Sequence, residues 1–182
     1  MVKNTLIYLA TGLLLSITAS AQNFICKNGV SSFFSQTPLE NIDAVNSKVG
    51  SVINTNSQEI VVQMTISEFK FKNRLMEEHF NENYLESEKF PNAIFKGKIQ
   101  ESIDWTRVGT YDVSAKGILT IHGVSKERIL NGKVTIDKNK IVLNSDFDVL
   151  LVDHKIDVPK LVFAKIAEKI KVQNKFEYVI LK

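Results

Sequence analysis

The chain has 182 residues, of which 44% are hydrophobic and 24% are charged, and its formal net charge is +3. So small a positive charge gives no argument for a nucleic-acid partner. Cys26 is the single cysteine, which excludes an intrachain disulfide.

Residues 1–21 have the pattern of a secretory signal peptide. Lys3 precedes an apolar run at residues 6–17, and the segment ends in Ala-Ser-Ala, a typical cleavage site. Cleavage after Ala21 would leave residues 22–182, which is 182 − 21 = 161 residues with a net charge of +3 − 1 = +2. The apolar run is too short to span a membrane comfortably, and no other segment approaches its length. We therefore expect one exported domain over residues 22–182, without a transmembrane segment in the mature chain.

Cys26 does not have the context of a lipid-modified cysteine. Such a residue directly follows the cleavage site, with small residues before it, whereas Phe24 and Ile25 precede this one. We expect Cys26 to be a small buried side chain near the first strand.

Alternation of apolar and polar residues predicts strands along most of the chain. The second of these strands is weak, and we expect Gly50 to break it. Ala115 and Gly117, in the middle of the clearest strand, indicate tight curvature or room beside the backbone. The expected strands cover residues 24–36, 42–53, 59–67, 93–100, 111–122, 130–136, 141–151 and 172–181.

The alternation changes phase near residue 68. Apolar side chains occupy the even positions from Ile60 to Ile66, but Phe69 and Phe71 are odd. A period of two can change phase only through an extra residue, a bend or the start of a helix. We expect one of these just before the next segment.

Residues 72–88 are predicted to form a short helical insert. Met76, Phe80 and Tyr84 follow one another at intervals of four, which places a large apolar and aromatic stripe on one helical face. Pro91 disfavours a helical residue before it and directs the chain into the next strand. A single aromatic helix among strands could cover the open end of a barrel, or it could fill a core.

A second short helix is expected at about residues 159–169. Pro159 is suited to a first helical turn, and Val162, Ile166 and Ile170 again follow at intervals of four. The residues thus predict an all-β domain of seven or eight strands with two short helices. About eight antiparallel strands can close around a small ligand, but periodicity alone does not separate a barrel from a two-sheet sandwich.

The sequence contains few residues suited to catalysis. His79, His122 and His154 are the only histidines, and no two have the spacing of metal ligands. There is no nucleophile elbow, glycine-rich phosphate loop or cysteine pair. We therefore expect a binding module without catalytic residues, metal or cofactor, although the absence of motifs does not exclude an enzyme.

Several short segments together resemble the YceI-like family of exported polyisoprenoid-binding proteins. The likeness spans most of the mature chain, and its specificity comes from the order and spacing of the segments. They are residues 68–71, His79-Phe80, Tyr84-Leu85, Phe90-Pro91 with Phe95, residues 117–124 (GILTIHGV), and Phe147-Asp148-Val149 with Asp153 and Ile156.

The resemblance implies an eight-stranded antiparallel lipocalin-like β-barrel in the periplasm. Such a barrel would hold an apolar chain, such as a polyprenyl lipid or an isoprenoid quinone, with no metal and no catalysis. The sequence departs from the common pattern at residues 158–171, where many relatives have a shorter segment. A helix there, over one end of the barrel, could narrow or shut the pocket.

A long apolar tail requires a dry tunnel, because the free energy of binding grows with the apolar area removed from water. The candidates for that apolar pocket are Phe71, Leu75, Met76, Phe80, Tyr84 and Phe95. The candidates for binding a polar head group at the mouth are Arg74, His79 and Asn81, and more weakly His122. Each of these four could instead face water or cap a helix.

Three functions remain open on the sequence. The first is a periplasmic carrier or store for an isoprenoid lipid, which requires a continuous cavity; a homodimer is compatible with it. The second is a structural or stress-related interaction domain with a filled barrel, whose function would lie on an outer surface such as the loop of Trp105. The third is a hydrolase, which requires a nucleophile within hydrogen-bond reach of His122 or His154.

Overall fold

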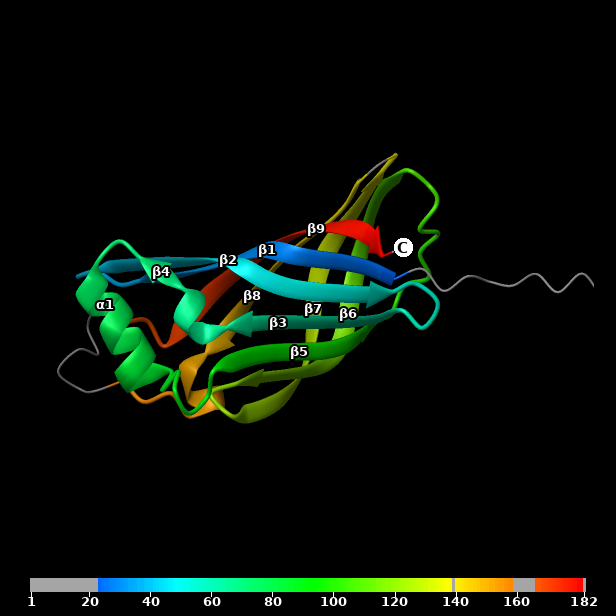
Figure 1. Ribbon diagram of the computed structural model, residues 1–182. Helices are drawn as coiled ribbons and strands as arrows, with labels where there is room; N and C mark the ends of the chain where they lie inside the picture. Colours follow the sequence, from blue (N-terminus) through cyan, green and yellow to red (C-terminus); the bar gives the residue numbers. More distant parts are fainter. Residues whose placement is uncertain (1–22, 139, 159–165, 182) are drawn as a thin grey trace, which may run out of the picture.

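A computed structural model describes residues 23–138, 140–158 and 166–181 of the chain. The described residues form strands joined by turns and one short helical insert (Figure 1). The strands are β1 (Asn23–Gln36), β2 (Asn41–Asn54), β3 (Glu59–Thr65), β4 (Lys70–Phe71), β5 (Asn92–Ile99), β6 (Gly109–Ile121), β7 (Val124–Asp137), β8 (Lys140–Leu150) and β9 (Lys169–Leu181).

Eight of these strands close into an antiparallel barrel. Their order is β1-β9-β8-β7-β6-β5-β3-β2, and β2 pairs back onto β1. The ninth strand, the two-residue β4, pairs with β2 at Ala44 and Val45. Closure of the sheet distinguishes the barrel from a sandwich and confirms the predicted fold class.

The second strand is longer and more regular than the sequence indicates. β2 runs without interruption through Gly50, so the predicted break there is wrong. Gly50 is held in the sheet by its pairing with Gln63 of β3, while the neighbouring residues of β2 also pair with β1. Pairing of Gly50 with β3, and of Val49 and Ser51 with β1, keeps this part of β2 extended.

The predicted change of phase before the insert is confirmed. A 3-10 turn, η1 (Ile66–Glu68), separates β3 from β4. The turn changes which positions face the core. The even-numbered Ile66 is buried before it and the odd-numbered Phe69 is buried after it. The amide of Ile66 donates to the carbonyl of Pro91, which joins this turn to the start of β5.

The helical insert is shorter than residues 72–88. It consists of α1 (Arg74–His79) and a π-helical turn, η2 (Phe80–Tyr84), and the side chain of Asn73 caps its start by accepting a hydrogen bond from the amide of Leu75. The amide of Leu85 donates to the carbonyl of Phe80, the wider spacing of a π turn.

The expected helix at 159–169 falls largely outside the described residues. Residues 159–165 are not described, residues 166–168 are not helical, and Lys169 is already the first residue of β9. Ile170 and Val172 explain the difference, because they also alternate with period two and pair with Val149 and Phe147 of β8.

The barrel has one end packed with side chains and one end covered by the insert. The core cluster at the packed end includes Phe24, Cys26, Ile53 and Tyr178, and the ring of Trp105 packs against Phe24 at 5.7 Å between centroids. Figure 1 shows α1 at the opposite end from the chain's C-terminus. Cys26 is buried, as predicted, and no helix among the described residues is long and apolar enough to cross a bilayer.

Candidate functional site

A cavity of about 430 Å³ lies inside the barrel, between the packed core and the insert. Its floor consists of apolar side chains that also belong to the core cluster, among them Ile60, Ile99, Leu143 and Phe176. Because these side chains fill the barrel below it, the cavity is closed at that end. Any ligand must therefore enter from the end that the insert covers or between the strands.

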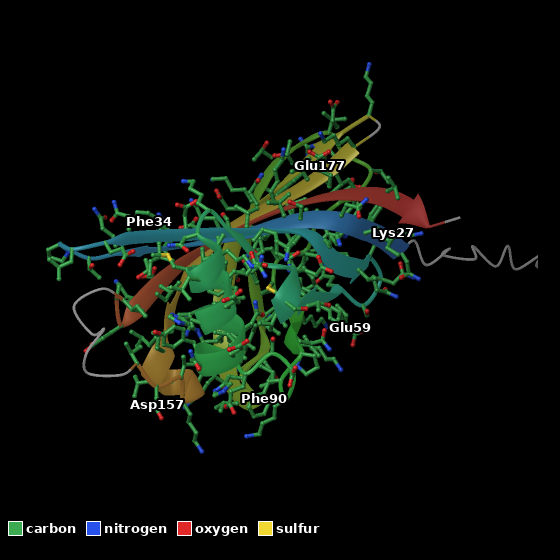
Figure 2. All side chains as sticks on the ribbon, turned by 60° about the vertical axis from the view of Figure 1, so that its left-hand side comes forward. Lys27, Phe34, Glu59, Phe90, Asp157 and Glu177 are labelled. Carbon is green, nitrogen blue, oxygen red and sulfur yellow. The ribbon has the colours of Figure 1, made fainter. Side chains whose placement is uncertain are left out.

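Four phenylalanine rings meet at the covered end. Phe80 of the insert lies 5.0 Å from Phe71, 5.4 Å from Phe33 and 5.7 Å from Phe69 between ring centroids. The contacts join η2 to β1, β4 and the residue between η1 and β4. Figure 2 turns this end toward the viewer and shows the insert in front of the strands. Phe80 is thus the ring through which the insert, a short segment of chain, packs onto three rings of the barrel wall at the covered end.

All six side chains predicted to line an apolar pocket do line this cavity. Five of them lie at the covered end, from β4 and the insert, and Phe95 of β5 lies deeper, against the core cluster. They are Phe71, Leu75, Met76, Phe80, Tyr84 and Phe95. The structure therefore brings these residues together, and whether they contact a ligand stays a prediction.

The four head-group candidates are placed differently from one another. His79 lines the cavity. Arg74 points outward, with its side chain 92% exposed and paired with Glu78 at 3.1 Å. Asn81 donates to the carbonyl of Glu77 within the insert, and in the described part of the chain its buried Oδ1 has no partner. Neither Arg74 nor Asn81 lines the cavity, so of the three candidates from the insert only His79 is in position to contact a ligand there.

His122 connects the insert to the rest of the barrel. It lies in the turn between β6 and β7, where Nε2 is 2.7 Å from Oε2 of Glu86 and Nδ1 is 3.2 Å from the carbonyl oxygen of His154. Its ring packs edge-on against Phe90 at 4.6 Å. The hydrogen bond from His122 is the main cause of the lowered pKa of Glu86. His122 is therefore a structural link beside the cover and lies outside the cavity lining.

His154 is fully buried in the 3-10 turn η3 (Leu151–His154), where Nδ1 lies 3.1 Å from the carbonyl oxygen of Val124. Burial lowers the pKa of its imidazole, because a charged ring would lose its hydration. In the described residues neither His122 nor His154 has a hydroxyl or thiol among its hydrogen-bond partners. Within the described part of the chain, neither ring therefore has the nucleophile that the hydrolase hypothesis requires.

The described residues also contain no group of three or more histidine, cysteine, aspartate or glutamate side chains that could hold a metal ion. The described wall of the cavity offers mainly apolar contacts, together with hydroxyl and amide groups, the carboxylate of Glu40 and the imidazole of His79.

Sequence reasoning missed the polar residues of the cavity wall. Ser31 and Asn174 are buried at positions where the inward alternation of β1 and β9 calls for apolar side chains. One signal in the sequence could have identified Asn174: it occupies the position between Val172 and Phe176 in the inward alternation of β9. A single polar residue in a strand is, however, also typical of the solvent-facing side.

The closed antiparallel sheet and its apolar interior define a lipocalin-like β-barrel. The family model described as YceI-like domain matches residues 21–178, most of the chain. The chain therefore belongs to the YceI-like domain family, and the resemblance deduced from the short segments is confirmed.

Solved structures share this fold at low sequence identity. A polyisoprenoid-binding domain from Saccharophagus degradans implicated in plant cell wall breakdown has a TM-score of 0.76 at 13% identity, covering 88% of this chain and 99% of that one. BcnA of Burkholderia cenocepacia has a TM-score of 0.61 at 13% identity, covering 85% and 96%. The YCEI protein of Campylobacter jejuni has a TM-score of 0.59 at 18% identity, covering 75% and 83%. A search of the curated proteins gave no match to this sequence.

Proposed function

We propose that this protein is an exported, periplasmic binding protein that holds an isoprenoid lipid or a quinone-like amphiphile inside its barrel, for carriage or storage. The observation that carries the proposal is the apolar cavity of about 430 Å³, closed at one end by core side chains and covered at the other by an aromatic insert. A volume of this size lies within the usual range of small-molecule sites, about 300–1,000 Å³.

The chemistry of the cavity wall favours an apolar ligand. Burial of apolar surface contributes about 25 cal/mol per Å², so a hydrocarbon chain gains most from a wall of aliphatic and aromatic side chains. Among the described residues of the cavity wall, the acidic, basic or phenolic side chains are those of Glu40, His79 and Tyr84. A ligand with many polar groups would lose its hydration here without regaining hydrogen bonds.

Two further observations support the proposal. The domain of Saccharophagus degradans that shares this fold is a polyisoprenoid-binding domain. The first 21 residues have the composition of a signal peptide, which favours export. The interaction domain with a filled barrel predicts no cavity, and the volume inside this barrel counts against it.

Lipid retention by variants of the cover tests the proposal. Phe80→Asp and Met76→Asp each place a carboxylate in the cavity wall and should abolish retention of co-purified lipid while the barrel still folds. Val152→Asp is the matched control, because Val152 is 79% exposed near the same end of the barrel and does not line the cavity. Its lipid content should equal that of the unaltered protein. Lipid retained in a folded Phe80→Asp protein would contradict the proposal.

A further inference from the structure

Three polar side chains form one row across the cavity wall. Ser31 of β1 is the direct cross-strand partner of Asn174 of β9, which is in turn the partner of Ser145 of β8. All three line the cavity. Side chains of directly paired residues point to the same face of a sheet. We refer to Ser31, Asn174 and Ser145 as the polar row.

The polar row lies deep in the barrel, between two apolar layers. The next inward-facing positions toward the packed end are Phe176 of β9 and Leu143 of β8. They pair with each other and form part of the floor. The next inward-facing position of β9 toward the covered end is Val172, which pairs with both Phe33 of β1 and Phe147 of β8. The polar row is therefore one layer above the floor, with the rest of the apolar wall between it and the insert.

Two atoms of the polar row lack hydrogen-bond partners in the described residues. Ser31 is 0% exposed and its Oγ has no partner, and Asn174 is 9% exposed and its Oδ1 has none. The Nδ2 group of Asn174 donates to Oγ of Ser145 at 3.2 Å. Buried polar groups are rarely left unpaired in proteins, because each then loses its hydrogen bonds to water without replacement. A hydroxyl donor and a carbonyl acceptor thus lie buried and unpaired in residues that line the cavity.

The neighbouring Asn46 shows the contrast with a purely structural amide. Asn46 pairs with Ser31 across β1 and β2 and is equally buried, but it does not line the cavity. Its Nδ2 donates to the carbonyl of Thr65 at 2.9 Å, and its Oδ1 accepts from the amide of Lys48 at 2.8 Å. The protein thus pairs both polar groups of the Asn46 amide, but among the described residues it leaves one polar atom unpaired in each of two residues that line the cavity.

Among the described residues, no charged side chain lines the deep part of the cavity. Glu40 lies in the turn between β1 and β2, and His79 and Tyr84 lie in the insert, all away from the row of residues paired with Ser31. A phosphate at the polar row would be buried without a cation, at a large cost in free energy.

We infer that the ligand enters the barrel with an uncharged polar end first, and that this end both accepts and donates a hydrogen bond, as the hydroxyl of a polyprenol does. The Ser31 hydroxyl donates to the ligand oxygen, and the ligand hydroxyl donates to Oδ1 of Asn174. The apolar tail then lies along Phe33 and Val172 toward the insert. This inference rests on the proposed function and differs from a head group held at the mouth. A quinone carbonyl would satisfy only Ser31, and a diphosphate neither group well.

Titration calorimetry with three matched probes tests the inference on lipid-free, full-length mature protein. Farnesol carries the hydroxyl, farnesene is the corresponding hydrocarbon, and farnesyl diphosphate carries the charge. Two hydrogen bonds should make farnesol bind about tenfold tighter than farnesene, and the diphosphate at least about 100-fold weaker than farnesol. Ser31→Ala and Asn174→Leu should each remove most of the preference for farnesol over farnesene.

Ser32→Ala is the matched control, because Ser32 lies beside Ser31 on β1 and does not line the cavity. It should leave all three affinities unchanged. Equal binding of farnesol and farnesene, or a preference that survives Asn174→Leu in a folded protein, would overturn the orientation while leaving the binding function intact. Failure of the folded protein to bind any of the three would overturn the proposed function as well.

Discussion

Replacing Phe80 with alanine removes the ring that joins the insert to the barrel. Phe80 contacts Phe33, Phe69 and Phe71 at centroid distances of 5.0–5.7 Å. Truncation of a fully buried phenylalanine costs about 3–5 kcal/mol, and each aromatic pair contributes about 0.5–1.5 kcal/mol beyond its buried area. Because Phe80 is only partly buried, we expect Phe80→Ala to lower the free energy of unfolding by about 2–3 kcal/mol.

Urea unfolding of the lipid-free protein, followed by circular dichroism, measures this loss. Leu75→Ala is the matched control, since Leu75 lies on the same insert but is 56% exposed. It should cost less than about 1 kcal/mol. A loss for Phe80→Ala no larger than that for Leu75→Ala would refute the conclusion that the four rings hold the cover in place.

Two further predictions concern stability. Gly117→Ala should destabilise the barrel by more than about 3 kcal/mol, because the added Cβ would lie 2.2 Å from the carbonyl oxygen of Lys96. Gly50→Ala is the control: its nearest neighbour is 3.8 Å away, and it should change the unfolding free energy by less than about 1 kcal/mol. Equal effects of the two variants in urea unfolding would contradict this prediction. Burial lowers the pKa of His154 in the folded protein from its ordinary value of 6.5. Below about pH 6.5 the unfolded chain therefore binds a proton at His154 that the folded protein does not bind. The free energy of unfolding should fall as the pH falls from about 6.5 toward the pKa of the folded protein. His154→Asn retains a donor for the carbonyl of Val124 and should reduce this pH dependence; an unchanged slope of unfolding free energy against pH would show that other groups cause it.

The strands were predictable wherever one side of the sheet is apolar throughout. Ile60 and Val62 in β3, and Val113 and Ala115 in β6, alternate with exposed residues and mark their strands clearly. β2 was harder to predict because two of its inward positions, Asn46 and Ser51, are polar side chains whose partners lie far away in sequence. Polar residues buried by tertiary hydrogen bonds remove the contrast on which period-two reasoning depends.

The cover of the cavity was also predictable, for a different reason. The stripe of Met76, Phe80 and Tyr84 needs only helical spacing to be recognised, and all three line the cavity. The polar row could not be found in the same way. Ser31 and Asn174 are 143 residues apart in sequence (174 − 31) and meet only because β1 and β9 close the barrel. A pairing that depends on closure is not contained in local periodicity.

Mass spectrometry of an organic extract tests the central claim most directly. The protein should be purified from its own envelope fraction, shown to be folded by circular dichroism, and extracted alongside Phe80→Asp prepared in the same way. The proposed function predicts one polyprenyl or quinone species in near-stoichiometric amount from the unaltered protein and its absence from the variant. An empty extract from folded, unaltered protein would contradict the account of this barrel as a lipid carrier or store.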